Sequence, residues 1–140
     1  MNYLADTTIL CEPRQKRPNP KVMRWLKANE TSLYTSVLVV GEIRYGIDLL
    51  PPGSAKRREL LAWLERLIDI MAGRVLSVNA RVAEEWAKLQ AEARAQKLVL
   101  PVVDSLLAAT ARRYRLTVAT NSVADFKAMG VKVVNPLEWP

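Results

Sequence analysis

Five short runs of strand-like composition, separated by longer segments with helical patterns, constrain the fold of this chain more than any other feature. The runs occupy residues 2–5, 32–36, 74–78, 116–120 and 131–134. Helical patterns begin at Pro20 and also cover 37–50, 54–73, 79–96, 101–114 and 123–130. Strands that alternate with helices in this way are typical of a mainly parallel sheet flanked by helices. We therefore expect a single α/β domain that spans residues 1–140.

The helix boundaries are predicted from capping residues. Asn19, Ser54 and Asn79 each precede a helical pattern and can accept a hydrogen bond from a free N–H at the helix start. Gly73 is placed to end the helix that Ser54 begins. That helix carries the clearest apolar face, formed by Leu60, Leu61, Leu64, Leu67, Ile68 and Met71. Because this spacing follows the helical period, the face should pack against the rest of the domain.

Chain length and cysteine content limit the class of protein. The chain has 140 residues, about the usual size of one domain. Its apolar runs are shorter than the roughly 18 to 20 residues needed to span a bilayer, and its N-terminus lacks the pattern of a signal peptide. The one cysteine, Cys11, cannot form an intramolecular disulfide. These features favour a reducing, cytoplasmic setting.

The charge balance and the absence of histidine narrow the possible chemistry. The chain carries 21 Lys and Arg against 14 Asp and Glu, and its net charge of +7 favours an anionic partner such as nucleic acid. It contains no histidine, which excludes the usual Ser-His-Asp and Cys-His arrangements. Glycine-rich phosphate-binding motifs are also missing. If the chain is an enzyme, we therefore expect its chemistry to depend on carboxylates, metal ions, or Lys and Arg.

Four carboxylates stand apart from other charges. Asp6 comes directly after the first strand-like run, and Asp125 lies shortly after the fourth. Asp104 is the only charged residue in the stretch 98–111, and Glu42 follows a long uncharged stretch. In parallel α/β folds the site usually lies beyond the carboxyl ends of the strands. We therefore expect the four acids to converge at that edge of the sheet.

A cluster of unpaired carboxylates is unfavourable without a cation, because the charges repel one another and lose hydration. Hard oxygen ligands suit Mg²⁺ or Mn²⁺, and such a site can hydrolyse a phosphodiester without histidine. Each acid also has an ordinary structural explanation. Asp104 could stabilise a helix N-terminus, Asp6 and Asp125 could cap short turns, and Glu42 could pair with Arg44 or with a distant Arg.

The same motifs resemble those of PIN-domain ribonucleases. The segment YLADTTIL (3–10), followed by Glu12, resembles the opening LLDTNVLSE of that family. Residues 36–53, 100–120 and 123–136 resemble its second, third and fourth motifs. The pattern is particularly similar to the VapC-type toxins of bacterial toxin–antitoxin pairs, in the FitB-like branch. The resemblance covers nearly the whole chain.

This resemblance implies a PIN-like fold and a metal-dependent endoribonuclease that acts as the toxin of a toxin–antitoxin pair. Asp6 and Asp104 would be metal ligands for Mg²⁺, or for Mn²⁺, and Glu42 would be a ligand or would position a water. Asp125 would complete the site, although this position varies across the family. A cognate antitoxin and a homodimer are also implied. The small polar residues expected to orient the acids are Thr7, Thr8, Ser36, Thr120 and Ser122.

The chain departs from the family pattern at two places. Thr8 stands where the family usually has Asn, and Asn121 and Ser122 stand where it has Arg and Asn. Because a hydroxyl replaces only part of the hydrogen bonding of an amide, a second hypothesis is a weakened PIN domain that mainly binds an antitoxin or RNA. A third hypothesis is a haloacid-dehalogenase-like phosphatase, although Thr8 occupies the position of the second Asp that such enzymes need.

Three basic segments give the positive charge a possible role. Residues 14–17, 56–58 and 112–115 could guide an RNA backbone toward the acidic site. The alternative is that each segment is a solvated face of a loop or helix, which is the common role of clustered surface charge.

Overall fold

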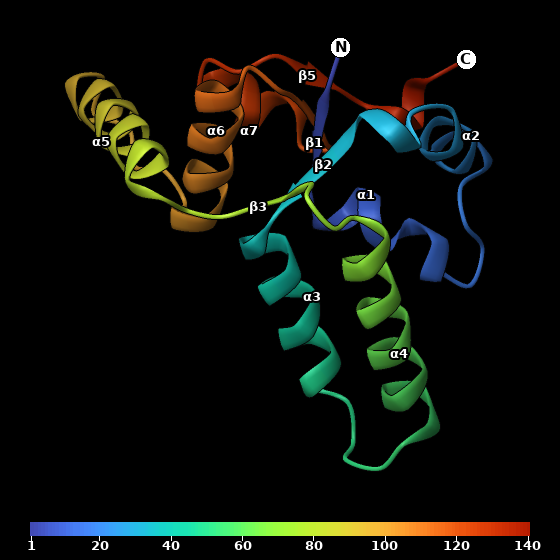
Figure 1. The fold of residues 1–140 in the computed structure, drawn as a ribbon. Helices are drawn as coiled ribbons and strands as arrows, with labels where there is room; N and C mark the ends of the chain where they lie inside the picture. Colours follow the sequence, from blue (N-terminus) through green and yellow to red (C-terminus); the bar gives the residue numbers. More distant parts are fainter.

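A five-stranded parallel sheet, with the strand order β3-β2-β1-β4-β5, forms the centre of the molecule in the computed structural model, which describes all residues from 1 to 140 (Figure 1). The strands are β1 (Tyr3–Ala5), β2 (Leu33–Ser36), β3 (Val75–Leu76), β4 (Thr117–Ala119) and β5 (Val133–Val134). Every pairing is parallel, and Leu4 of β1 lies opposite Val118 of β4. The five predicted strands are confirmed, although each is shorter than its apolar run.

Seven α-helices connect and cover these strands. They are α1 (Thr7–Cys11), α2 (Pro20–Ala28), α3 (Val37–Asp48), α4 (Ala55–Ile70), α5 (Ala80–Ala95), α6 (Val102–Tyr114) and α7 (Val123–Ala128). Single 3-10 turns lie at Glu12–Arg14, Glu30–Ser32 and Pro136–Glu138. The chain has no helix that is both long enough and apolar enough to cross a membrane.

The predicted helix caps are confirmed. Asn19, Ser54 and Asn79 accept hydrogen bonds from free N–H groups in the first turns of α2, α4 and α5. Gly73 adopts a left-handed conformation with φ of 85° three residues after α4 ends. Helix α1 is the exception, because the pattern at the end of β1 does not predict it. Its five residues are too few to display a helical period.

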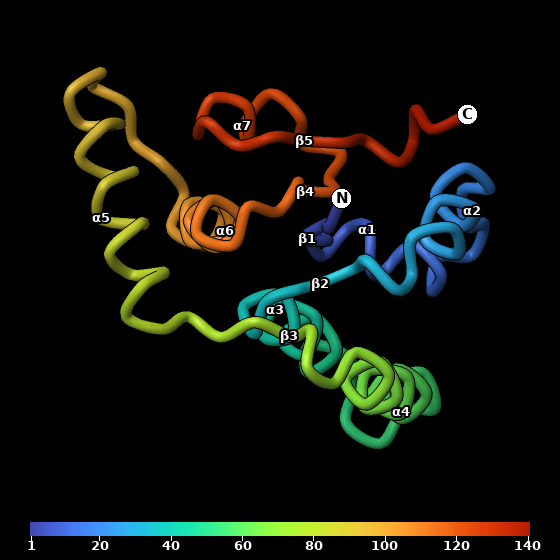
Figure 2. Tube along the Cα trace, turned by 45° about the horizontal axis from the view of Figure 1, so that its top comes forward, coloured from blue at the N-terminus to red at the C-terminus, as the bar shows by residue number.

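The core lies between the sheet and the helices on its two sides. Leu4 and Ala5 of β1 and Val118 and Ala119 of β4 are almost completely buried, as expected for central strands of a parallel sheet. Figure 2 shows α6 and α2 on opposite sides of these strands. Trp25 of α2 is buried edge-to-face against Tyr3 of β1.

Two helix pairs extend from this core (Figures 1 and 2). Helices α3 and α4 form an antiparallel pair joined by the turn at 49–54, and α5 lies outermost, against α6. The predicted apolar face of α4 is only partly covered. Leu64 and Met71 are buried, whereas Leu60, Leu61 and Leu67 are half-buried and Ile68 is exposed.

Candidate active site

The site residues come from segments that meet at the carboxyl edge of the sheet. Asp6 directly follows β1, and Thr120 directly follows β4. Helix α6 precedes β4 and runs in the opposite direction, so its first turn, which contains Asp104, lies at the same edge. Helix α3 starts at the end of β2 and carries Glu42 in its second turn. The topology therefore brings three of the four predicted acids to one edge, and α7 adds Asp125.

Asp6 is held by hydrogen bonds on both carboxylate oxygens. Its Oδ1 accepts from the hydroxyl of Thr8 at 2.8 Å and from the backbone N–H of Ile9 at 3.3 Å. Its Oδ2 accepts from the hydroxyl of Thr120, a fully buried residue 114 positions away in the sequence. Asp6 is only 9% exposed, and such contacts compensate a buried carboxylate for lost hydration. Its side chain therefore has a fixed orientation.

Glu42 is exposed and is oriented by a residue of α1. The hydroxyl of Thr7 donates to Glu42 Oε1 at 2.9 Å, which ties α3 to the helix that Asp6 begins. The predicted alternative, a pair between Glu42 and Arg44, is wrong. Arg44 instead pairs with Asp48 at 2.9 Å, because residues four apart share a helix face and residues two apart do not.

Asp104 shows the electrostatic coupling of the acids most directly. Its pKa is raised above the ordinary value, first by partial burial and then by the negative charges of Glu42, Asp6 and Asp125. These four acids were expected to lie together, and each of the other three contributes to the raised pKa of Asp104.

Asp125 is exposed, and its carboxylate makes no hydrogen bond within the chain. The prediction that Asp125 caps a turn is therefore wrong.

Two of the ordinary explanations hold alongside this coupling. Asp6 is the N-cap of α1, and Asp104 is in the first turn of α6, where a negative charge complements the helix dipole. A helix dipole favours the charged form and lowers the pKa of a carboxylate, whereas the pKa of Asp104 is raised. Burial and repulsion by the other acids therefore outweigh the dipole at this position.

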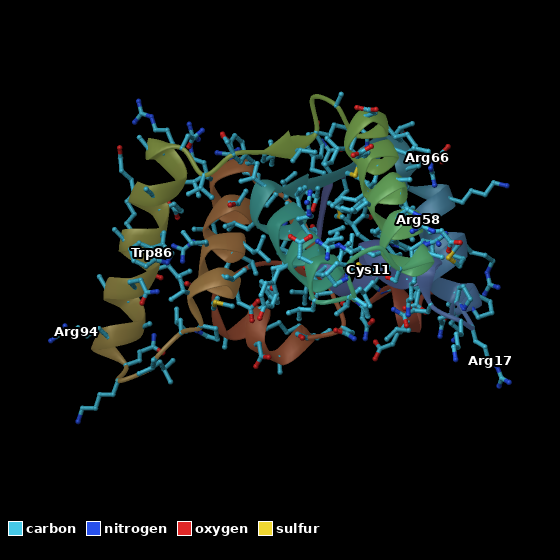
Figure 3. All side chains as sticks on the ribbon, turned by 90° about the horizontal axis from the view of Figure 1, so that it is seen from below. Cys11, Arg17, Arg58, Arg66, Trp86 and Arg94 are labelled. Carbon is cyan, nitrogen blue, oxygen red and sulfur yellow. The ribbon has the colours of Figure 1, made fainter.

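A buried hydroxyl beside Asp104 anchors the first turn of α6. Ser105 Oγ accepts from the indole Nε1–H of Trp86 at 3.0 Å and from the amide of Gln90 at 3.3 Å, and donates to the carbonyl of Val102 at 2.8 Å. Figure 3 shows Trp86 on α5, the helix beside α6. Trp86 and Gln90 are four residues apart and therefore lie on one face of α5. Nothing in the sequence alone links them to the turn that carries Asp104.

The small polar residues expected to orient the acids have different roles. Thr7, Thr8 and Thr120 contact acids directly, and Thr8 also lies 3.3 Å from Oδ1 of Asn121. Ser36 instead caps α3 by accepting from the N–H of Leu38. Ser122 contributes its backbone N–H, which donates to Thr120 at 3.0 Å. The structure thus assigns Thr8 a direct contact with Asp6 where the family usually has Asn.

The donor set suits a hard divalent cation, but it is not a preformed cage. Four carboxylates raise the negative potential at one edge of the sheet, and oxygen ligands are those that Mg²⁺ and Mn²⁺ prefer. No three His, Cys, Asp or Glu side chains are spaced so that they could hold one ion. Mg²⁺ needs only one or two carboxylates beside water, so such a spacing is compatible with binding.

Comparison with known protein families gives one match over most of the chain. The sequence profile described as "PIN domain" matches residues 3–131. The chain is 38% identical to the plasmid stability protein StbB of Pseudomonas syringae pv. tomato over 96% of this chain and 98% of that protein. It is 33% identical to VapC ribonuclease Y4jK of Sinorhizobium fredii, over 96% of this chain and 97% of the relative.

A solved structure has nearly the same fold. The structure of FitAB bound to an IR36 DNA fragment contains a chain that superimposes with a TM-score of 0.90 at 32% identity. The superposition covers 99% of this chain and 97% of that chain. The strand order and the helix pairs described above are therefore those of a known architecture.

Proposed function

The chain belongs to the PIN-domain family, and from that premise we propose that it is an endoribonuclease and the toxin of a toxin–antitoxin pair. The observation that supports this activity best is that Asp6, Glu42 and Asp104 lie at the carboxyl edge of the sheet, with Asp125 on α7, in a chain without histidine. The phosphatase hypothesis does not agree with membership of this family. The PIN-domain relatives named ribonuclease support RNA as the substrate.

We propose that the divalent ion is Mg²⁺, with Asp6 and Asp104 as its carboxylate ligands; Glu42 would be a further ligand or would position a water, and Asp125 would complete the site. When bound, such an ion activates water and stabilises the charge that develops on the phosphodiester oxygens. Within the chain, Thr8 and Thr120 orient Asp6 and Thr7 orients Glu42. These contacts favour catalysis over the hypothesis of a weakened domain that only binds, because the Thr8 hydroxyl supplies an orienting hydrogen bond to Asp6.

We further propose a cognate antitoxin as the protein partner. The similar chain in the FitAB structure and those in VapBC structures come from complexes of this kind, several of them bound to DNA. The homodimer and the cytoplasmic location expected from the sequence stay predictions. Tyr45 of α3 and Leu49, directly after α3, are exposed apolar residues that a protein partner could cover.

The activity is tested with the purified chain, free of any partner protein, incubated with RNA in Mg²⁺, in Mn²⁺ or in EDTA. We expect cleavage with either metal ion and none with EDTA, resolved by gel electrophoresis of labelled RNA. Equal cleavage in EDTA would contradict a metal-dependent site. Absence of cleavage under every condition would favour the hypothesis of a binding module.

Cys11 offers a second test of the cation that does not depend on activity. Burial raises the pKa of the Cys11 thiol to about 11, and the charges of Asp6 and Glu42 add to the effect. The thiol lines the same cavity as Thr7 and Glu42. Since the thiolate is the reactive form, we expect very slow alkylation by iodoacetamide at pH 8, and a severalfold faster reaction when Mg²⁺ offsets the carboxylate charges. Mass spectrometry measures the rate.

The control for this experiment is the Asp104→Asn variant, whose weakened site should lose most of the Mg²⁺ effect. Burial is the largest cause of the raised pKa, so alkylation should stay slower than that of an exposed thiol even with Mg²⁺. An alkylation rate that does not respond to Mg²⁺ at millimolar concentration would mean that no cation binds beside these acids.

A further inference from the structure

A basic basin opens beside the acidic site. It is an open depression of about 780 Å³ without apolar side chains, and it is lined by Glu12, Arg14, Gln15, Lys16, Arg17 and Lys56. The basic residues come from the loop after α1 and from the first turn of α4. Four cations surround one carboxylate, so the basin is suited to an anion.

The basin adjoins a smaller cavity whose lining includes Glu42, one of the four acids. This cavity, of about 300 Å³, shares Arg14, Gln15 and Lys56 with the basin. Its far wall contains Thr7 and Glu42, the hydrogen-bonded pair of the acidic site. The remaining wall is largely apolar and is formed by Cys11, Ile43, Gly46, Ile47, Leu60 and Trp63. A path with a basic entrance and an apolar wall therefore ends at Glu42.

The basic loop is ordered, and its cations are free to bind a ligand. Glu12 Oε1 accepts from the N–H of Asn19 at 2.8 Å, which ties together the two ends of the loop. The Glu12 carbonyl accepts from the N–H of Gln15 at 3.1 Å. Arg14, Lys56 and the other basin cations form no salt bridge within the chain. Their charge is therefore not neutralised by neighbouring acids.

Two residues of the other predicted basic segments are neutralised by acids. Arg112 pairs with Glu85 at 3.0 Å and with Glu92 at 3.1 Å, so it connects α6 to α5. Arg57 pairs with Asp48 at 3.2 Å. The basin is lined by residues 14–17 and by Lys56 of the segment 56–58, whereas no residue of 112–115 lines the basin or the cavity beside it.

We propose that this basin and the adjoining cavity bind a single-stranded segment of the RNA substrate next to the cleaved bond. Arg14 and Lys56, on the shared wall, contact backbone phosphates, and the apolar wall with Trp63 accepts a base. The inference rests on the proposed ribonuclease function. RNA fits better than an acidic protein segment, because unpaired cations adjoin an apolar wall with an aromatic side chain, and this wall lies in the same cavity as Glu42.

The test measures binding without cleavage. A fluorescein-labelled single-stranded RNA of mixed sequence is titrated in EDTA with the wild type, with Arg14→Ala/Lys56→Ala, and with the charge-matched control Arg81→Ala/Arg94→Ala. The control residues are exposed on α5, and Figure 3 shows Arg94 at the opposite end of the molecule from Arg17. Fluorescence anisotropy gives the affinity at several salt concentrations, and circular dichroism confirms folding.

We expect the basin variant to bind at least tenfold more weakly and the control to change less than about twofold. The logarithm of the association constant falls as the logarithm of the salt concentration rises. Each lost phosphate contact should make this negative slope shallower by about 0.7, so the loss of two contacts should make it shallower by about 1.4. The charge-preserving variant Arg14→Lys/Lys56→Arg should bind within about threefold of the wild type, because Lys and Arg both contact phosphates.

Three results would overturn this assignment. The wild type could fail to bind RNA in EDTA, both double variants could lose affinity equally, or the basin variant could bind RNA normally while losing only its protein partner. Failure of the proposed activity gives a different pattern. In that case the wild type binds RNA through the basin but does not cleave it with Mg²⁺ or Mn²⁺.

Discussion

The Asp104→Asn variant should lose at least about 100-fold in RNA cleavage and yet unfold at a higher temperature than the wild type in EDTA. The loss of cleavage is expected because a ligand of the ion contributes to several kcal/mol of transition-state stabilisation. The gain in stability is expected because partial burial disfavours the charged Asp104 carboxylate, and because Glu42, Asp6 and Asp125 repel it. Gel assays and thermal unfolding measure the two effects on one protein.

The direction of the stability effect follows from linkage. Because the pKa of Asp104 is raised, the folded state holds this proton more tightly than the unfolded state does. The ionised side chain therefore lowers the stability of the fold as the pH rises through the raised pKa. Asn has no charge to lose, so the variant avoids this penalty at neutral pH. The difference between the two proteins should shrink as the pH falls below the ordinary range of aspartate.

Asp69→Asn is the matched control, because Asp69 is exposed on α4 and forms no salt bridge. It should change neither cleavage nor the unfolding temperature appreciably, since isolated surface charges contribute little to stability. If Asp104→Asn cleaved RNA at the wild-type rate with Mg²⁺, Asp104 would have no catalytic role. If the variant instead unfolded at a lower temperature, the helix dipole would outweigh repulsion by the other acids.

The strands and most of the helices can be predicted from the sequence, because they depend on local signals such as apolar runs and capping residues. Strand composition and the caps Asn19, Ser54 and Asn79 locate the strands and most helices within a few residues. Helix α1 is missed because one short turn carries no period. The expected pair between Glu42 and Arg44 is wrong because residues two apart on a helix point to different faces; Arg44 pairs with Asp48 instead.

The acids of the site can be predicted from the sequence, whereas the contacts that hold them cannot. Isolation from other charges indicates Asp6 and Asp104, and parallel topology then places them at one edge. The hydrogen bond from Thr120 to Asp6 joins residues 114 positions apart, and that from Trp86 to Ser105 depends on how α5 packs on α6. Such contacts leave no periodic trace, because a single polar residue at a helix or strand end has many possible partners.

Thr120→Val should lower cleavage about 10- to 100-fold, the usual cost of removing a group that orients a metal ligand. Valine has nearly the shape of threonine, so the core stays filled while the hydroxyl is lost. The Asp6 carboxylate then loses its donor at Oδ2, and the backbone N–H of Ser122 loses its acceptor. Leaving buried polar groups without partners should also lower the free energy of unfolding by about 1–3 kcal/mol.

Two further variants separate orientation of Asp6 from general loss of stability. Thr110 is also a fully buried threonine, but its hydroxyl donates only to the carbonyl of Leu106 within α6. Thr110→Val should therefore cleave RNA as the wild type does.

Thr120→Ser keeps the hydroxyl and should retain most of the activity, although it loses a methyl group from the core. Equal activities of Thr120→Val and the wild type, at a temperature where both are folded, would mean that Asp6 needs no orientation by Thr120. A loss confined to Thr120→Val would instead show that this buried hydroxyl sets the geometry of the acidic site.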